Sequence, residues 1–129
     1  MSIEEFPLAW RWTSEAHAVL PPKVLQRLIP IKPNMVKLID EMPNGIERGG
    51  LTRKAQDEAK TKDWLSGLPV TADEVTLIWN NETGLKMPWA TLVSWWSDFC
   101  YPSSDDVTII LGDGKYLLWH HEEVFEFCG

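Results

Sequence analysis

The sequence predicts an α+β fold, in which an antiparallel sheet of about four to five strands carries about three to four helices, packed mainly on one of its faces. Two patterns lead to this prediction. Apolar residues recur every third or fourth position over residues 89–100, as in a helix, and alternate with polar residues over residues 107–127, as in strands. The chain of 129 residues has the length of one domain, so we expect residues 1–129 to share one core.

The helix expected for residues 89–100 follows Pro88, which is favoured in a first helical turn because its missing N–H costs nothing there. Asp98 should face water together with Thr91 and Ser94, and Pro102 should end the helix. The buried face is expected to consist of Trp89, Leu92, Val93, Trp96 and Cys100.

A three-strand antiparallel meander is expected to follow, with strands at residues 107–111, 115–120 and 124–127. Its first two strands flank Gly112-Asp113-Gly114, and an Asp-Gly pair between apolar runs is typical of a tight hairpin turn, which needs positive φ. The residues expected to share the buried face are Val107, Ile109, Leu111, Leu117 and Trp119.

The N-terminal part of the chain is less regular. Residues 10–12 are expected to form an edge strand with both indoles on one side. Prolines bound two short helices, over residues 23–29 and 34–41, which we expect to pack as a helical hairpin over the sheet. Residues 42–53 contain prolines and glycines that are typical of a loop.

Three further elements are expected before the helix at residues 89–100. Thr52 should cap a helix over residues 53–66. Residues 73–80 alternate like a strand, and residues 85–87 are expected to pair back against them across a turn.

The chain is acidic, and its acidity is concentrated near the C-terminus. The net charge is −7. Residues 98–129 hold seven acids and one base, whereas residues 1–97 hold 12 acids and 11 bases. Such a field repels nucleic acids and anionic membranes and attracts basic proteins. We therefore expect a basic protein partner and no nucleic-acid or membrane partner, and the oligomeric state stays open.

Eight tryptophans are many for a chain of this length, so an aromatic patch or cleft is expected on the surface. The two cysteines, Cys100 and Cys128, do not make a disulfide framework. The first residues lack an apolar signal core, and no run reaches membrane-spanning length. These features predict a cytoplasmic protein with reduced thiols and no cofactor.

The string His120-His121-Glu122-Glu123 contains two of the three histidines of the chain. Consecutive side chains of a strand point to opposite faces, so His120 and His121 cannot easily share a metal ion. One histidine can join the carboxylate two residues on, as His120 with Glu122 or His121 with Glu123, but two ligands do not make a metal site. The alternative is a solvated strand end without function.

Asp105 and Asp106 are candidates for a general base or an acidic cation clamp if a histidine lies within hydrogen-bonding distance. Their loop should lie at the same end of the sheet as the histidines. The alternative is that both acids only solvate the loop. Ser103 and Ser104 lack the strand–turn–helix context of a nucleophile elbow. The sequence contains no dinucleotide-binding, Walker A, zinc-protease, EF-hand or CxxC motif.

Taken whole, the chain resembles a family of small bacterial proteins of unknown function, through residues 10–12, 74–79 and 96–99 and the ending HEEVFEF. That resemblance implies no activity. The segment SSDDVTIILGDGKYLLWHHEE is similar to part of the SUKH-type toxin-immunity proteins, which runs from an acidic or glycine-rich loop through strands to an aromatic–His–acid ending. This similarity implies that an acidic, aromatic surface blocks a basic site of a toxin.

The favoured functional prediction is a non-catalytic, immunity-like binding protein whose acidic, aromatic C-terminal surface engages a basic protein. Two alternatives stay open. One is a small hydrolase or metal-assisted enzyme that uses Asp106 with His120 or His121, and the other is a structural or oligomerisation domain with a pairing edge strand. No catalytic residue is assigned. The predicted binding residues are Trp95, Asp105, Asp106, His120, His121, Glu122 and Glu123.

Overall fold

A computed structural model of the chain describes residues 2–14, 19–40 and 51–129. These residues confirm the α+β class, but they contain seven strands and five α-helices, more of each than predicted. The strands are β1 (Ile29–Ile31), β2 (Leu51–Lys54), β3 (Glu74–Asn80), β4 (Thr83–Pro88), β5 (Val107–Gly112), β6 (Lys115–His120) and β7 (Val124–Cys128). The helices are α1 (Trp10–Thr13), α2 (Pro22–Leu25), α3 (Pro33–Asp40), α4 (Glu58–Ser66) and α5 (Trp89–Phe99), after a 3-10 turn at Ile3–Glu5.

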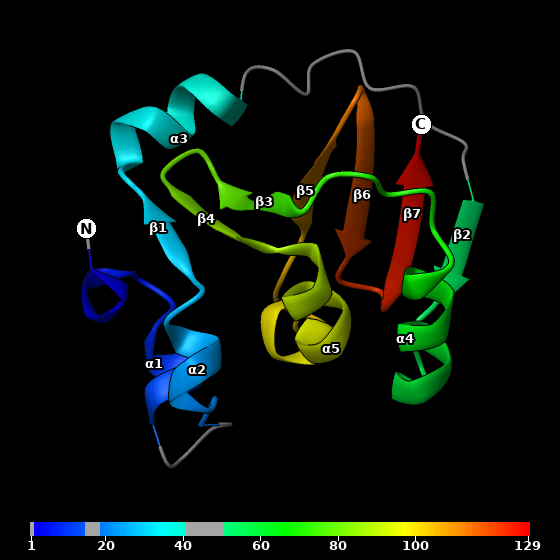
Figure 1. The fold of residues 1–129 in the computed structure, drawn as a ribbon, viewed down its shortest axis with the longest axis horizontal. Helices are drawn as coiled ribbons and strands as arrows, with labels where there is room; N and C mark the ends of the chain where they lie inside the picture. The colour runs from blue at the N-terminus through cyan, green and yellow to red at the C-terminus, as the bar shows by residue number, and fades with distance from the viewer. Residues whose placement is uncertain (1, 15–18, 41–50) are drawn as a thin grey trace.

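All seven strands form one antiparallel sheet in the order β1-β4-β3-β5-β6-β7-β2 (Figure 1). The predicted meander is confirmed as β5, β6 and β7, in which Val107 pairs with Trp119 and Trp119 with Phe125. At the turn between β5 and β6, Asp113 and Gly114 have φ values of 54° and 73°. These positive values are those of a tight hairpin turn, which explains the Asp-Gly pair.

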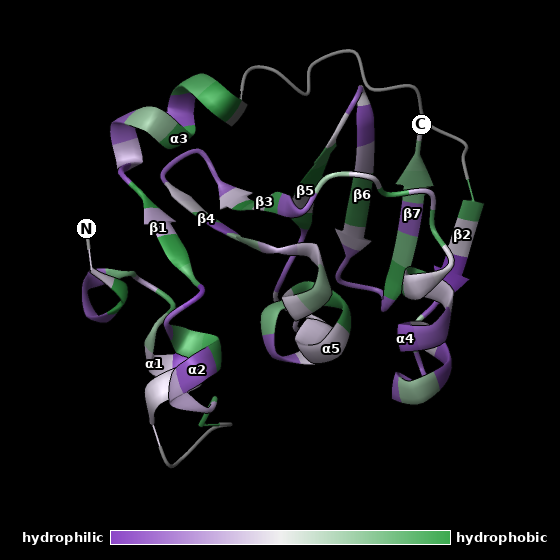
Figure 2. Cartoon of the chain, viewed as in Figure 1, coloured by the Kyte–Doolittle hydropathy of each residue, from purple (hydrophilic) through white to green (hydrophobic). Residues whose placement is uncertain are grey.

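Four helices cover one face of the sheet and one helix covers part of the other. Figure 1 shows α1, α2, α4 and α5 on the same side, whereas α3 lies on the opposite side near β1 and β4. The main core fills the space between the sheet and α1, α2, α4 and α5. Its fully buried side chains include Leu77, Ile109, Leu117 and Phe125, and Figure 2 shows the apolar stretches of β5 and β7. Beneath α3, a smaller cluster consists of Val36, Ile31 and Ile78.

Residues 10–12 form part of helix α1 and not the predicted edge strand. The indole of Trp12 is fully buried and contacts the rings of Phe6, Trp79 and Phe99 at centroid distances of 5.9, 6.3 and 5.1 Å. Its neighbour Arg11 is buried as well. A half-exposed edge strand would alternate in burial, whereas one turn of helix allows neighbouring side chains to enter the core together.

The predicted helical hairpin is also wrong. Helix α2 ends at Leu25, and residues 29–31 form the edge strand β1, which pairs with β4. Pro30 is compatible with this position because an edge strand has one side without sheet hydrogen bonds. Strand β1 separates α2 from α3, and the two helices lie on opposite faces of the sheet (Figure 1).

The segment before α4 is a strand and not the first turn of a helix. Strand β2 pairs with β7, with Leu51 opposite Phe127. Helix α4 begins at Glu58, and its cap is Asp57, whose carboxylate accepts the Lys60 N–H at 3.0 Å. Thr52 therefore caps no helix. The loop predicted for residues 42–53 lies outside the described residues except for its last part, which belongs to β2.

Helix α5 lies at the predicted place, with Leu92 and Phe99 fully buried. It is kinked at Trp95, whose φ and ψ are −126° and 23°. Thr91, expected to face water, is only 8% exposed and lines a groove together with residues of α2. The expected surface patch of tryptophans is reduced to Trp10, since the other seven are buried or partly buried.

Both cysteines are buried, and no disulfide joins them. Within the described residues, none of the helices combines the length and apolar character that crossing a membrane requires.

Candidate functional site

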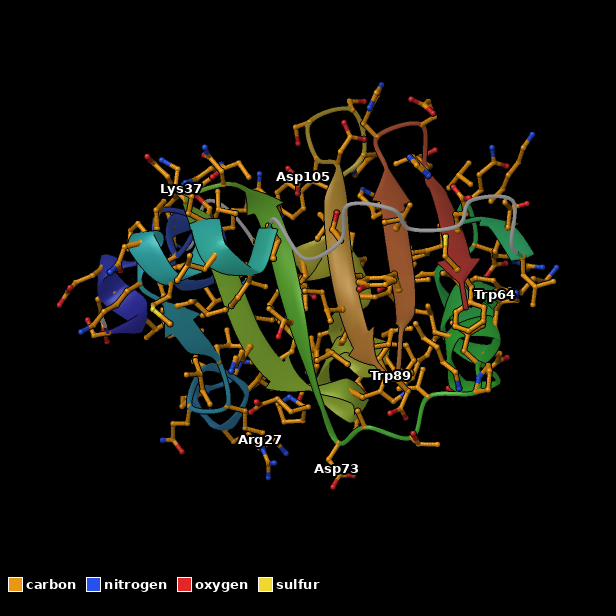
Figure 3. All side chains as sticks on the ribbon, turned by 90° about the horizontal axis from the view of Figure 1, so that it is seen from above. Arg27, Lys37, Trp64, Asp73, Trp89 and Asp105 are labelled. Atoms are coloured by element: carbon orange, nitrogen blue, oxygen red, sulfur yellow. The ribbon has the colours of Figure 1, made fainter. Side chains whose placement is uncertain are left out.

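Two loops meet at one end of the sheet, where Figure 3 labels Asp105. One is the loop between α5 and β5, and the other is the turn between β6 and β7. Two backbone amides donate hydrogen bonds between them: the Ser103 N–H donates to the His121 carbonyl at 2.8 Å, and the His121 N–H donates to the side-chain oxygen Oδ1 of Asp106 at 3.0 Å. Ser103 and Glu123 have positive φ values of 69° and 65°, so both loops turn sharply where they meet. These contacts bring Asp106 and His121 together.

His121 lies between two carboxylates, and we name Asp106, His121 and Glu122 the His121 cluster. The Nδ1 atom of His121 lies 3.0 and 3.2 Å from the two carboxylate oxygens of Asp106, and its Nε2 atom lies 2.8 Å from Glu122 Oε1. Carboxylates only accept hydrogen bonds, so this arrangement favours an imidazolium with a proton on each nitrogen. All three side chains are exposed, by 49%, 66% and 65% for His121, Asp106 and Glu122.

The electrostatics of the cluster follow from these contacts. The hydrogen bond with Asp106 raises the pKa of His121 above its ordinary value, and the charges of Asp106 and Glu122 raise it further. Conversely, hydrogen bonds from the side chain and backbone of His121 lower the pKa of Asp106. Both shifts favour the charged forms of His121 and Asp106, so the opposite charges of the cluster partly compensate one another.

His120 points to the other side of the strand, as predicted, and forms a separate pair. Its Nε2 atom lies 3.0 Å from Glu126 Oε1, and Glu126 is only 6% exposed. His120 therefore pairs with Glu126 and His121 with Glu122, which differ from the two combinations considered from the sequence, His120 with Glu122 and His121 with Glu123. The reason is that Glu126 lies on β7 next to β6, diagonally across from His120, while the turn swings Glu122 towards His121.

Asp105 is buried, at 5% exposure, and does not belong to the acidic surface. Its two carboxylate oxygens accept bonds of 2.6 and 2.9 Å from the buried guanidinium of Arg11, which lies 4.1 Å from the ring centroid of Tyr101. Burial raises the pKa of the Asp105 carboxyl, but hydrogen bonds from Arg11 and from the Tyr101 amide outweigh it, and the pKa is lowered overall. The ion pair between Asp105 and Arg11 thus joins α1 to the loop before β5.

Asp106 and His120 both line a shallow groove of about 330 Å³ beside the His121 cluster. Trp79, Thr108 and Leu118 contribute to its walls. Trp95, by contrast, lines a different groove between α2 and α5. Of the seven predicted residues, the structure therefore brings together Asp106, His121 and Glu122, with the half-buried Glu123 next to them in the turn.

The described part of the chain contains no group of three or more His, Cys, Asp or Glu side chains that could hold a metal ion. Its nucleophiles are engaged elsewhere. The Ser104 hydroxyl donates to Asp105 at 3.3 Å. Burial and the charge of Asp105 raise the pKa of Cys100 well above its ordinary value, as expected of an inert thiol. The contact between Asp106 and Nδ1 of His121 has the geometry of a carboxylate that orients a histidine base. The other ring nitrogen, Nε2, contacts Glu122.

Sequence reasoning missed Arg11, Trp79 and Tyr101, which hold the loop through Asp105. Arg11 lies 94 residues from Asp105 along the chain, and no local pattern links them. The one available signal was a charged residue between two tryptophans, because a cation among large aromatic residues is often stacked or paired.

Comparison with known proteins adds no relative. No family model, curated protein or solved structure matches this chain. The similarity to toxin-immunity proteins therefore stays a prediction.

Proposed function

We propose that the protein is a non-catalytic binding module that engages a basic protein through the His121 cluster. One observation carries this proposal: two exposed carboxylates contact the same imidazole, and one of them, that of Asp106, also accepts the backbone N–H of His121 in the neighbouring loop. Carboxylates that are ordered before binding lose little conformational entropy when a partner arrives. The cluster also lies in the most acidic third of the sequence.

The partner would approach with arginine or lysine side chains. The oxygens of Asp106 and Glu122 have several lone-pair positions each, so they can accept further hydrogen bonds while they contact His121. The acidic field around them would speed association with a basic surface, and salt would weaken this effect. Protonated His121 reduces the negative charge of the cluster, so binding should strengthen as the pH rises through the raised pKa of His121.

The test is an affinity capture from the native lysate with three baits. The first is the wild type and the second is the Asp106→Lys/Glu122→Lys variant. The third is Glu4→Lys/Asp63→Lys, which changes the net charge equally at two exposed positions away from the cluster. We expect a basic protein that wild type and control retain and the cluster variant loses, with all three baits folded by circular dichroism. Retention of the same protein by the cluster variant would refute the proposal.

A second candidate function is general-base hydrolysis, favoured by the 3.0 Å contact between Asp106 and His121 and by the neighbouring groove. The base would be the neutral form of His121, which is present above its raised pKa, and an activated water would be the nucleophile. Hydrolysis of p-nitrophenyl acetate by wild type, lost in His121→Gln and retained in Glu123→Gln, would support this candidate. Equal rates for all three proteins would exclude His121 as the base for this reaction.

A third candidate function is self-association through β2. Among the described residues this edge strand has β7 as its only strand neighbour, and Leu51 is 62% exposed. Unpaired edges are templates for strand addition. Light scattering would show a dimer that Leu51→Lys dissociates, whereas a monomeric wild type would rule out this candidate.

A further inference from the structure

His121 lies between two carboxylates as a bound cation would. Its Nδ1 atom lies 3.0 and 3.2 Å from the two oxygens of Asp106, and its Nε2 atom lies 2.8 Å from Glu122 Oε1. Asp106 therefore approaches one edge of the ring with both oxygens, and Glu122 approaches another edge with one oxygen. With a proton on each nitrogen, the imidazole is a planar cation that donates hydrogen bonds in two directions.

An arginine guanidinium has the same chemical features. It is planar, it is always charged, and it carries N–H donors along its edges. One edge can donate two bonds to Asp106 while a neighbouring edge donates to Glu122, since arginine forms such paired bonds with carboxylates. A lysine ammonium is a compact point charge without this fork. The carboxylates lie on different sides of an imidazole ring, so one ammonium in its place would contact them less well than a group of similar width.

The imidazole can leave this position without disturbing the core. The His121 side chain is 49% exposed and belongs to the turn between β6 and β7. Asp106 keeps another contact when the ring turns away, because its Oδ1 atom also accepts the backbone N–H of His121 at 3.0 Å. The Ser103 N–H still donates to the His121 carbonyl at 2.8 Å. The loop contacts that place Asp106 therefore do not depend on the imidazole.

The charged groups around the ring come from two segments. Asp106 belongs to the loop before β5 and Glu122 to the turn after β6, and both raise the pKa of His121. His120, at the end of β6, acts on Asp106 through its charge, and the half-buried Glu123 follows in the turn. Above the raised pKa of His121, one ring nitrogen faces a carboxylate without a proton to donate. The imidazole then holds the two carboxylates less well.

We infer that the His121 cluster is a site for an arginine side chain of the partner, and that His121 occupies this site until the arginine replaces it. The inference rests on the proposed function of the cluster and names the side chain that it recognises. Contacts of a cation with the remaining lone pairs would be single exposed pairs, which are weak. A guanidinium in place of the imidazole bonds both carboxylates at once, which favours arginine over lysine.

The test is an NMR titration of the ¹⁵N-labelled full chain with Nα-acetyl-arginine methylamide and, separately, with Nα-acetyl-lysine methylamide. The arginine probe should bind several-fold more tightly than the lysine probe, with saturable shifts of the amides of residues 103, 106, 121 and 122. Its affinity should rise as the pH increases through the pKa of His121. Equal affinities of the two probes, or shifts that never saturate, would overturn the inference. They would leave the proposed function standing if the cluster still captures a basic protein.

Three variants separate the imidazole from bulk charge, with core amide shifts as the check of folding. His121→Ala removes the ring and keeps the backbone N–H, so it should bind the arginine probe several-fold more tightly and with no pH dependence over the range in which the wild type changes. Asp106→Asn/Glu122→Gln should lose the preference for arginine. The control Lys60→Gln removes an exposed cation from α4 and should leave both affinities unchanged. Equal gains for both probes in His121→Ala would show that His121 acts only through its charge, and they would overturn the inference, as would an unchanged affinity for the arginine probe.

Discussion

Replacing Asp105 by asparagine should destabilise the fold by about 3–5 kcal/mol, because the buried Arg11 guanidinium loses its counter-charge. The two side chains are only 7% and 5% exposed, and the bonds between them measure 2.6 and 2.9 Å. Asp105 also accepts bonds from the Trp79 indole and the Tyr101 amide. An asparagine would turn its NH₂ group towards some of these donors. The loss would be a large part of the stability of an ordinary domain, about 5–15 kcal/mol.

Urea unfolding at neutral pH, followed by circular dichroism, measures this loss. The matched control is Asp106→Asn at the next position, where the side chain is 66% exposed, and it should change stability by less than about 1 kcal/mol. The double variant Arg11→Met/Asp105→Leu should recover part of the loss because it leaves no unpaired charge. A loss below about 1 kcal/mol for Asp105→Asn would refute the reasoning. A double variant as unstable as the sum of both single changes would refute it as well.

The same pair determines the response to acid. Because the pKa of Asp105 is lowered in the folded state, the unfolded chain binds its proton more tightly. The stability that Asp105 provides is therefore complete above the ordinary aspartate pKa of about 3.9 and decreases as the pH falls through the folded value. The Asp105→Asn variant should show a flatter decrease of stability with falling pH. A slope identical to that of the wild type would contradict this assignment.

Three further predictions concern single residues. The pKa of His121, followed by NMR, should lie above its ordinary value and should fall in the Asp106→Asn variant. The stability that this contact provides is fully present below the pKa of the unfolded chain and is lost as the pH rises through the pKa of the folded protein. An unchanged pKa in the variant would contradict the contact. Cys100 should react with a thiol reagent only as fast as the protein unfolds, and rapid labelling of the native protein would show an accessible thiolate. Gly114→Ala should cost about 1–2 kcal/mol in thermal or urea unfolding because its φ is 73°, although nothing lies within 4 Å of the added methyl group. The control Gly67→Ala, at a φ of −85°, should lose no stability through strain, and equal losses at both positions would contradict the turn geometry.

The sequence predicted those elements whose apolar pattern is long and local. The stripe of α5 and the alternation of β5, β6 and β7 extend over many residues and leave few alternatives. The edge strands β1 and β2 were missed because they contain three and four residues, too few for a pattern. These residues form strands because they pair with residues far along the chain, as Leu51 pairs with Phe127.

The candidate site was predictable to a similar extent. Asp106 comes directly before β5 and the histidines come at the end of β6. Because β5 and β6 are antiparallel neighbours, these positions lie at the same end of the sheet, and Asp106 was expected near a histidine. Nothing in the sequence distinguishes Asp105 from Asp106, yet one is buried against Arg11 and the other is exposed beside His121. That difference arises from the docking of α1, a contact 94 residues distant along the chain. Trp95 was selected for its position beside the buried stripe, and it lines a groove that the acidic-surface hypothesis did not foresee.

The measurement that tests the binding proposal most directly is the affinity of the captured basic protein for the three baits, at low and at physiological salt. The proposal predicts that Asp106→Lys/Glu122→Lys weakens binding about tenfold or more, because lysines replace both carboxylates of the cluster. The control Glu4→Lys/Asp63→Lys should stay within about threefold of the wild type, and salt should weaken both alike. Unchanged affinity of the cluster variant, or an equal loss in the control, would contradict the assignment of the His121 cluster as the binding surface.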